Sequence, residues 1–394
     1  METNDVVIVG MARTPIGDFL GSLSSLTAVE LAEIAAGEAI KRAGITAKQI
    51  QEVVLGTVCK EGMKGNPARQ VQISLGIDAE ASAVTVEQQC ASSMRALEVA
   101  AQQIMLGKTD TALVCGTESM SNIPHMILGA RKGTKLGPIN VVDAMQYDAL
   151  IDAFSNESIM RTAENVAEKY HVTREQQDEY ALLSQQRAAK AIAEGKFIDE
   201  IVPVEIKTRK GTTIVDADEH PRETTIQILS RLKPALDKNG TITAGNASGI
   251  NDGACAAVIM SSKKAAKLNL KPLVKILSTV TVGVTPEIMG IGPIYAIPKA
   301  IELAGLKKED IDYYEINEAF AAQVVPCLKE LDIGLDKANA NGSGIALGHP
   351  VGMTGLRLLI SGYYELKKRG QKYGCGSLCA GGGPAMAVVF EVLK

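Results

Sequence analysis

A chain of 394 residues with 46% hydrophobic residues is long enough to form two to three domains around a sizeable core. Its formal net charge of −4 argues against nucleic acid or an anionic membrane as the main partner. No apolar run approaches the roughly 18 residues that a membrane span needs. We therefore expect neither nucleic acid nor a membrane as a partner.

The cysteines form no CxxC pair and no cysteine–histidine cluster with the spacing of a zinc site. They are odd in number and scattered through apolar segments, which argues against a disulfide framework. They are Cys59, Cys90, Cys115, Cys255, Cys327, Cys375 and Cys379. The N-terminal residues lead directly into a strand-like run, and no retention or peroxisomal tripeptide ends the chain. We expect a cytoplasmic protein without a bound metal.

Strand-like apolar runs alternate with helical ones along both ends of the chain. In the first 119 residues, strands are predicted at 5–10, 52–58, 83–86 (as a buried strand) and 111–116, with helices at 28–44 and 94–107. Beyond residue 250, strands are predicted at 255–262, 273–283, 374–383 and 385–393, with a helix at 356–370. This alternation predicts an α/β protein with layered sheets and helices.

An internal repeat relates the two ends of the chain. Residues 39–56, "AIKRAGITAKQIQEVVLG", align without a gap on residues 300–317, "AIELAGLKKEDIDYYEIN". In each copy a later helix ends at a glycine, Gly107 or Gly370, and a strand follows. We interpret residues 1–119, completed by 250–270, and residues 271–394 as two copies of one half, and residues 120–249 as an insertion that covers one face.

The stretch "QQCASSMRAL", residues 88–97, places Cys90 between a strand and a helix. Free N–H groups and the helix dipole favour an anion at such a turn, so the pKa of a cysteine thiol there is expected to fall. This favours a nucleophilic cysteine. The alternative is a small buried apolar residue, which is the more common environment of a free cysteine.

Four motifs lie at corresponding ends of the two halves: "EQQCASS", "EINEAFAAQ", "NGSGIALGHPVGMTG" and "LCAGGGPAMA". Together with "TAENVAEKY" and "VTPEIMGIGP", they resemble the thiolase family over essentially the whole chain, and its short-chain biosynthetic branch in particular. The resemblance implies a five-layered α-β-α-β-α fold of two similar halves with a covering loop domain. It also implies acyl transfer between coenzyme A thioesters, either the Claisen condensation of two acyl-CoA molecules or the reverse thiolysis, with acyl-CoA and free coenzyme A as partners and no cofactor.

The resemblance implies a role for each motif. Cys90 would carry the acyl group, and His349, which the repeat places opposite Cys90, would be its base. Cys379 would exchange the α-proton of the second acyl group. His349 and a water held by Asn317 would form one oxyanion hole, and the backbone N–H groups of Cys90 and Gly381 the other.

The resemblance also implies binding residues for the substrate. Ser248 would contact the pantetheine arm and Arg222 the adenine end of coenzyme A. Met289, Phe320 and Leu236 would line the acyl pocket. The chain departs from the family at Glu87, where Asn is usual, and at Ala91 and Ser93, which replace glycines and put the geometry of that turn in question. The segment "ESIM" replaces "YHMG" in the pocket wall, so the acyl length stays open.

Two other functions are compatible with parts of this pattern. A decarboxylating β-ketoacyl synthase also has a "CASS"-like turn, but uses histidine or asparagine in place of a second cysteine. A non-catalytic acyl-CoA-binding subunit would not need all four reactive residues. Residues 131–154 resemble the tetramerisation loop of the short-chain branch, so we expect a homotetramer made of two dimers.

Overall fold

The computed structural model describes residues 5–209 and 211–393. Ten strands in this part of the chain form one mixed sheet with two similar halves. The N-terminal half consists of β1 (Val6–Arg13), β10 (Asn251–Ser261), β5 (Thr111–Ser119), β3 (Glu52–Gly56) and β4 (Ser82–Val86) in that spatial order, with β2 (Gly17–Asp18) paired to β10. The C-terminal half consists of β11 (Val274–Gly283), β14 (Pro384–Val392), β13 (Tyr373–Cys379) and β12 (Tyr313–Ile316).

The two halves repeat one topology. In each, the first strand pairs antiparallel with the last one, and β3 and β12 run parallel to their neighbours β5 and β13. Within the sheet, three residue pairs of β1 and β11, from Val6↔Ile276 to Ile8↔Val274, join the two halves. The predicted duplicated α/β fold is therefore confirmed. The division of the chain at residues 119, 249 and 270 stays a prediction.

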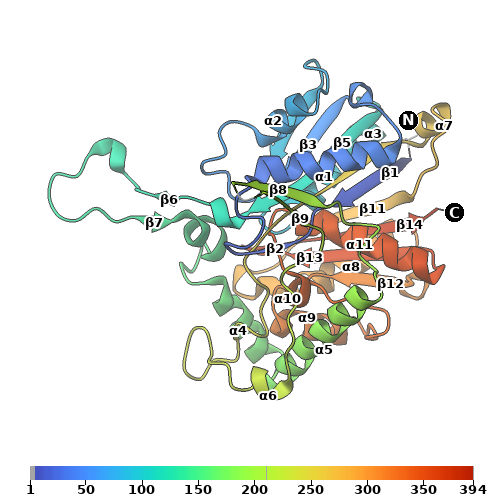
Figure 1. Cartoon of the computed structure of the whole chain (residues 1–394). Helices are drawn as coiled ribbons and strands as arrows, with labels where there is room; N and C mark the ends of the chain where they lie inside the picture. Colours follow the sequence, from blue (N-terminus) through green and yellow to red (C-terminus); the bar gives the residue numbers. More distant parts are fainter. Residues whose placement is uncertain (1–4, 210, 394) are drawn as a thin grey trace.

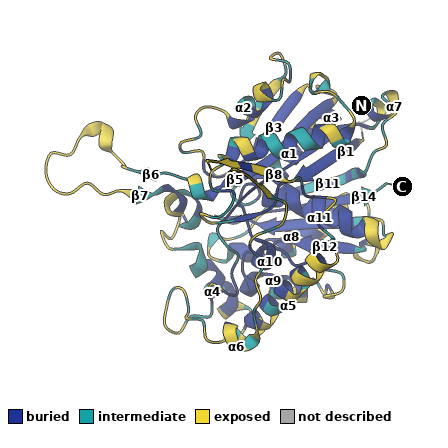
Figure 2. Cartoon of the chain, in the orientation of Figure 1, coloured by how far each residue is buried: buried dark blue, intermediate teal, exposed yellow. Residues whose placement is uncertain are grey.

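Helices complete five layers (Figure 1). Helix α1 (Ala28–Ala43) packs on the outer face of the N-terminal half, and α8 (Pro293–Leu303) and α9 (Ala321–Glu330) cover the outer face of the C-terminal half. Between the half-sheets lie α3 (Ser92–Met105) and α11 (Thr354–Arg369), which contact each other. Residues 354–366 are buried on every side of α11, as expected for a helix in a central layer (Figure 2).

Capping residues set the ends of the long helices α1 and α11. A capping box of Thr27 and Glu30 starts α1, and Gly44 ends it at φ 68°. Gly370 ends α11 at φ 67°, as predicted. The buried strand predicted at residues 83–86 is wrong, because β4, which contains these residues, lies at the sheet edge beside β3 and is partly exposed along its length.

The helices of the insertion lie beside the C-terminal half, and a long arm extends away from the body of the molecule (Figure 1). The arm leaves the short hairpin of β6 (His125–Met126) and β7 (Val142–Asp143). The remaining elements of the insertion are a π-helix (Met145–Leu150), α4 (Ile159–Lys169), α5 (Arg174–Ala193), the hairpin β8 (Val204–Thr208) and β9 (Gly211–Val215), and α6 (Ile226–Leu229). Helices α2 (Pro67–Ser74), α7 (Ser262–Lys267) and α10 (Gly344–Leu347) complete the fold.

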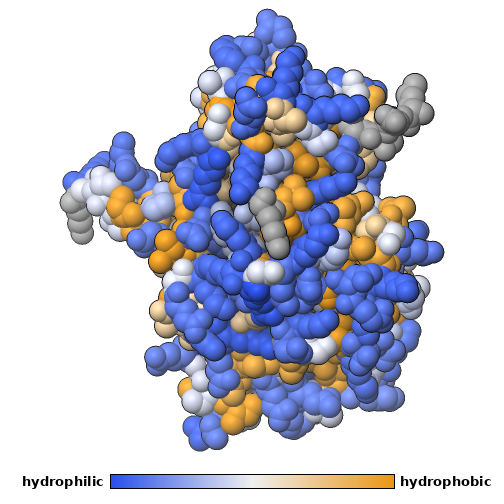
Figure 3. All heavy atoms as spheres, turned by 90° about the vertical axis from the view of Figure 1, so that its right-hand side faces the viewer, coloured by the Kyte–Doolittle hydropathy of each residue, from blue (hydrophilic) through white to orange (hydrophobic). Residues whose placement is uncertain are grey.

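The surface is mainly polar. The face in Figure 3 shows hydrophilic side chains with small apolar areas between them. Exposed large apolar side chains gather instead in and beside the arm: Ile127, Leu128, Leu136, Ile139, Val141, Tyr147 and Phe154. Within residues 5–209 and 211–393, no helix is both long enough and apolar enough to span a membrane.

Candidate active site

Cys90 lies in the turn between β4 and α3, two positions before the first residue of that helix. All seven cysteines fall within the described residues, and Cys90 is the one that is not fully buried. Hydrogen bonds from the Ala91 amide to Gln88 O (3.1 Å) and from the Ser92 amide to Gln89 O (2.9 Å) form the turn. Cys90 is thus accessible on a tightly folded backbone.

The side chains that replace glycine in this turn fit without strain. Ala91 has φ −87° and ψ 1°, and Ser93 already belongs to α3. Gln89 is the residue of this turn that has a left-handed backbone conformation, at φ 48°, which is uncommon for a residue with a side chain. The Glu87 carboxylate accepts a hydrogen bond from the Gln89 amide, and the Gln89 side chain donates to Asp148 O (3.1 Å). These two bonds hold the strained residue next to the candidate nucleophile.

The expected fall in the pKa of the Cys90 thiol is wrong. Burial of the thiol raises its pKa to about 11, and the charges of Glu118 and Glu87 add to this effect. The N–H groups of Gly381 and of Cys90 itself act in the opposite direction but do not overcome burial. At neutral pH the group is therefore a thiol, and it needs a base to become a nucleophile.

His349 is a buried, neutral imidazole with a defined tautomer. It lies in the loop between α10 and α11, and burial, followed by the charge of Arg357, lowers its pKa to about 3. Its Nδ1 is 2.6 Å from Thr354 Oγ1, and that hydroxyl donates its own proton to Pro350 O (2.9 Å). Nδ1 must therefore carry the imidazole proton, which leaves a lone pair on Nε2. The Asn317 side-chain amide lies 3.3 Å from Nε2.

Three groups of the N-terminal half hold the His349 loop. Asn251 Oδ1 accepts from the His349 amide (2.9 Å), Glu118 from the Gly352 amide (3.0 Å) and Ser93 Oγ from the Leu356 amide (2.9 Å). Val351 of this loop belongs to an apolar cluster against which Cys90 packs. The structure therefore brings the histidine loop of one half to the cysteine turn of the other.

Cys379 and Gly381 reach the same place from the end of β13. Cys379 is buried, and its pKa lies well above the ordinary value because of burial and, next, the neighbouring Cys90. The Gly381 N–H points to the Cys90 thiol, and a Cβ on Gly381 would lie 3.5 Å from the Gln89 side chain. Gly382 and Gly383, at φ 81° and 106°, form a backbone that favours glycine. Five sequence-predicted residues thus lie around one centre: Cys90, Asn317, His349, Cys379 and Gly381.

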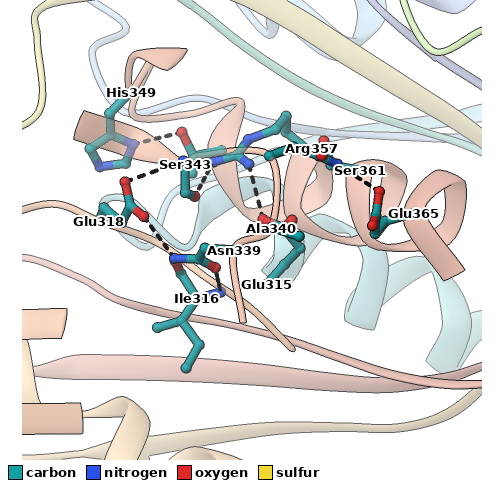
Figure 4. Close-up of polar contacts among 12 residues, drawn as sticks. Glu315, Ile316, Glu318, Asn339, Ala340, Ser343, His349, Arg357, Ser361 and Glu365 are labelled. Carbon is teal, nitrogen blue, oxygen red and sulfur yellow. Dashed lines mark hydrogen bonds and ion pairs between the residues drawn. The ribbon is translucent and has the colours of Figure 1, made fainter. Parts of the chain in front are cut away.

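Glu318 supports this centre more extensively than its sequence context indicates. Its carboxylate accepts from Ser184 (2.6 Å), Asn339 (2.9 Å) and Tyr180 (3.0 Å), and from the amides of Ser343 (3.2 Å) and Ile345 (3.3 Å). Figure 4 shows the Glu318 carboxylate between Asn339 and Ser343. Glu318 therefore fixes Asn317, its chain neighbour, to the segment that leads into His349. The partners lie up to 138 residues away, so no local signal could have found this role.

Arg357 lies behind the same segment. Its guanidinium is buried, donates to Ser343 Oγ (3.1 Å) and forms an ion pair with Glu315 (3.5 Å) (Figure 4). Burial raises the pKa of the Glu315 carboxyl to about 8. The positive charge of Arg357 is the second cause of the low pKa of His349, after burial.

The predicted substrate residues lie at different distances from this centre. Met289 and Phe320 form an apolar cluster with Cys379, against which Ile159 and Met160 pack, whereas the half-buried Leu236 is not part of that cluster. The Ser248 amide donates to Ala319 O (2.9 Å), which places the Ser248 loop beside Phe320. Arg222 donates to Ala244 O (3.2 Å) further along the insertion.

A cavity of about 580 Å³ opens beside the cysteine turn. Residues 87–89, residues 147–156 and Gly381–Gly382 contribute to its lining. Among the residues that the structure describes, no group of three or more His, Cys, Asp or Glu side chains is placed to hold a metal ion.

Two protein families match the chain along almost its whole length: the thiolase N-terminal domain over residues 6–263 and the thiolase C-terminal domain over residues 270–392. The chain belongs to the thiolase family. A curated acetyl-CoA acetyltransferase from Syntrophomonas wolfei is 46% identical over 99% of this chain and 100% of its own length. The probable acetyl-CoA acetyltransferase of Escherichia coli is 45% identical over 98% and 99%, respectively.

Solved structures of other thiolase-family members have the same fold. An acetyl-CoA acetyltransferase from Syntrophomonas wolfei superposes with a TM-score of 0.98, at 49% identity over the whole of both chains. A human mitochondrial 3-ketoacyl-CoA thiolase in complex with CoA superposes with a TM-score of 0.96, at 39% identity over 99% of this chain and 98% of that one. The predicted five-layered thiolase fold is confirmed.

Proposed function

We propose that this chain is an acetyl-CoA C-acetyltransferase of the thiolase family, which also cleaves 3-ketoacyl-CoA by thiolysis. Its similarity to acetyl-CoA acetyltransferases over nearly the full length supports this function. The observation that carries the proposal is that Cys90, the one cysteine that is not fully buried, lies beside the buried Cys379 and that its thiol contacts the Gly381 N–H. A decarboxylating synthase is not favoured, because it would lack the second cysteine, and a non-catalytic subunit would not need the complete set.

In the thiolysis direction, Cys90 Sγ attacks the 3-keto carbon while its proton moves to His349 Nε2. The C–C bond breaks, and the departing acetyl-CoA enolate takes the proton of the Cys379 thiol. His349 then returns its proton to the Cys379 thiolate, and free coenzyme A attacks the acyl group on Cys90 and gives its thiol proton to His349. The Cys90 thiolate leaves and recovers the proton from His349. Condensation is the same sequence in reverse.

The resting protonation states support this assignment. A thiol whose pKa lies well above the ordinary value still holds its proton when the enolate forms, as an acid must. The neutral His349 keeps an unprotonated Nε2, as a base must. We assign the two oxyanion holes to His349 with a water held by Asn317, and to the N–H groups of Cys90 and Gly381.

For the substrate, we propose that Ser248 contacts the pantetheine arm and Arg222 the adenine end of coenzyme A. Met289 and Phe320 line the acyl pocket, with Leu236 at its outer part. We propose that the reaction needs no cofactor or metal. The human thiolase crystallised with CoA supports coenzyme A as the ligand class. A thiolysis assay against 3-ketoacyl-CoA substrates of increasing length tests the function, and activity on none of them would contradict it.

We also propose a cytoplasmic homotetramer, a dimer of dimers, that acts in fatty acid metabolism. The arm between β6 and β7 exposes apolar side chains, with Leu136 97% exposed, and such a surface favours association. Light scattering at micromolar concentration should give the mass of four chains. A monomer would contradict the proposed assembly.

A further inference from the structure

We propose that His220 is a positioning residue that links the Ser248 loop to the candidate catalytic base His349, acting through Asp18 and Asn251. The inference rests on the proposed function, because it assigns His349 as the base and Ser248 to coenzyme A. From the sequence, no role was assigned to His220, Asp18 or Asn251.

A continuous set of hydrogen bonds connects these side chains. His220 Nδ1 lies 2.5 Å from Asp18 Oδ1. The Asn251 side-chain amide donates to the same Asp18 oxygen (3.3 Å) and to Gly17 O (3.0 Å). Asn251 Oδ1 then accepts from the backbone amide of His349 (2.9 Å). The path runs from the insertion to His349 through the pairing of β2 with β10, in which Asn251 lies opposite Asp18.

Each step constrains the next one. The Asp18 carboxylate offers only acceptors, so His220 Nδ1 must carry the proton between them. Asn251 can place its Oδ1 toward His349 only while its amide group faces Gly17 and Asp18. About half of the Asp18 side chain is exposed, so without His220 its carboxylate could turn toward water. His220 thereby fixes the side chain that orients Asn251.

The loop that bears Ser248 packs directly on this set. A Cβ on Gly249 would lie 2.4 Å from His220 Cε1 and 2.8 Å from Asn251 Oδ1. His220 is 8% exposed, and its Nε2 is enclosed without a hydrogen-bond partner. Such an atom is costly to bury, which indicates that the ring is retained for its contacts with Asp18 and Gly249. If a bound pantetheine arm moves the Ser248 loop, the side chains of His220 and Asn251, which the loop contacts at Gly249, must move with it.

A positioning role differs from a binding role in its kinetic effect. Replacing His220 should lower kcat for acetyl exchange between acetyl-CoA and free coenzyme A, because exchange needs Cys90 and His349, and should raise KM for coenzyme A by a smaller factor. Arg222 lies two residues further along, is proposed to contact coenzyme A, and is the matched comparison. Arg222→Ala should raise KM with a smaller effect on kcat.

The experiment compares His220→Ala, His220→Asn, Asp18→Ala and the double variant Asp18→Ala/His220→Ala in the full-length protein. Because small misplacements of a catalytic group are costly, His220→Ala should lower kcat for exchange by about 10- to 100-fold. In His220→Asn, the amide stands where Nδ1 was and should recover most of the rate. If His220 and Asp18 act through one path, kcat of the double variant should fall no further than kcat of either single variant.

A raised KM at unchanged kcat, or additive losses of kcat in the double variant, would each overturn the inference. If His220→Ala does not fold, Asp18→Ala compared with His220→Asn decides the same question. If the protein without any substitution catalyses no acetyl exchange, that result contradicts the proposed function instead.

Discussion

The Ser93 hydroxyl accepts a hydrogen bond from the Leu356 amide (2.9 Å) and donates one to Met353 O (2.9 Å). Helix α3, which follows the cysteine turn, and helix α11, which follows the histidine loop, therefore begin at one shared hydroxyl. Because the Leu356 amide is among the first four of α11, it has no partner within its own helix. A serine at this family glycine position thus joins the two halves where the candidate nucleophile and base meet.

Ser93→Ala should destabilise the protein by about 1–3 kcal/mol, since the buried Leu356 N–H loses its partner and Met353 O loses one of its donors. Urea unfolding measures the change. Ser230→Ala is the control, because its hydroxyl bonds Gln227 O within an exposed turn, and it should change stability by less than about 0.5 kcal/mol. Equal midpoints for Ser93→Ala and the unchanged protein would show that the shared hydroxyl contributes nothing.

Thr354→Val should slow acetyl exchange by about tenfold or more, a part of the 10²–10⁴-fold that a general base typically contributes. Valine keeps the shape of threonine but offers no acceptor to His349 Nδ1, so the imidazole is no longer held in the tautomer that leaves Nε2 free. Thr354→Ser restores the hydroxyl and should restore the rate. Loss of activity in both variants would point to packing instead of the hydrogen bond.

The protonation states predict the pH dependence of Cys90 alkylation without substrate. The thiol pKa is raised to about 11 and the imidazole pKa is lowered to about 3, so both groups are neutral at pH 7. The thiolate fraction should rise about tenfold per pH unit from pH 7 to 9, because this range lies below the thiol pKa. Iodoacetamide rates over that range measure it. A plateau with a midpoint near pH 7 would instead indicate a thiolate–imidazolium pair.

Cys379→Ser should separate the two half-reactions. A serine hydroxyl is a far weaker acid than a thiol, so condensation and thiolysis should fall by about 10²–10⁴-fold. Acetyl exchange, which needs Cys90 and His349 only, should persist. If exchange and thiolysis fall equally, Cys379 supports the first step or the fold, and the proposed division of roles is wrong.

Local patterns predicted the architecture because they depend on short-range periodicity. The repeat of residues 39–56 at 300–317 anticipated matching sheet halves, and Gly107 and Gly370 anticipated where two helices end. Burial was harder to predict. β4 lies at the sheet edge because no further strand pairs with its outer side in the described part of the chain. The raised pKa of Cys90 depends on burial by residues distant in the sequence and on Glu118 in β5.

The residues that the sequence analysis missed act through distant partners. The Asn251–His349 bond spans 98 residues and the His220–Asp18 bond spans 202. Neither bond leaves a spacing or periodicity that a single sequence could show. The candidate reactive residues could be proposed from the sequence because each lies in a compact motif, as Cys379 does close to three glycines.

The central claim is that Cys90 carries the acyl group. Incubation with isotopically labelled acetyl-CoA, rapid acid quenching and peptide mass spectrometry test it directly, with Cys90→Ala as the control. We expect one acetyl group on the peptide that contains Cys90, its loss on addition of free coenzyme A, and no label in Cys90→Ala. Label on Cys379 or Cys115 alone, or label that persists in Cys90→Ala, would contradict the account.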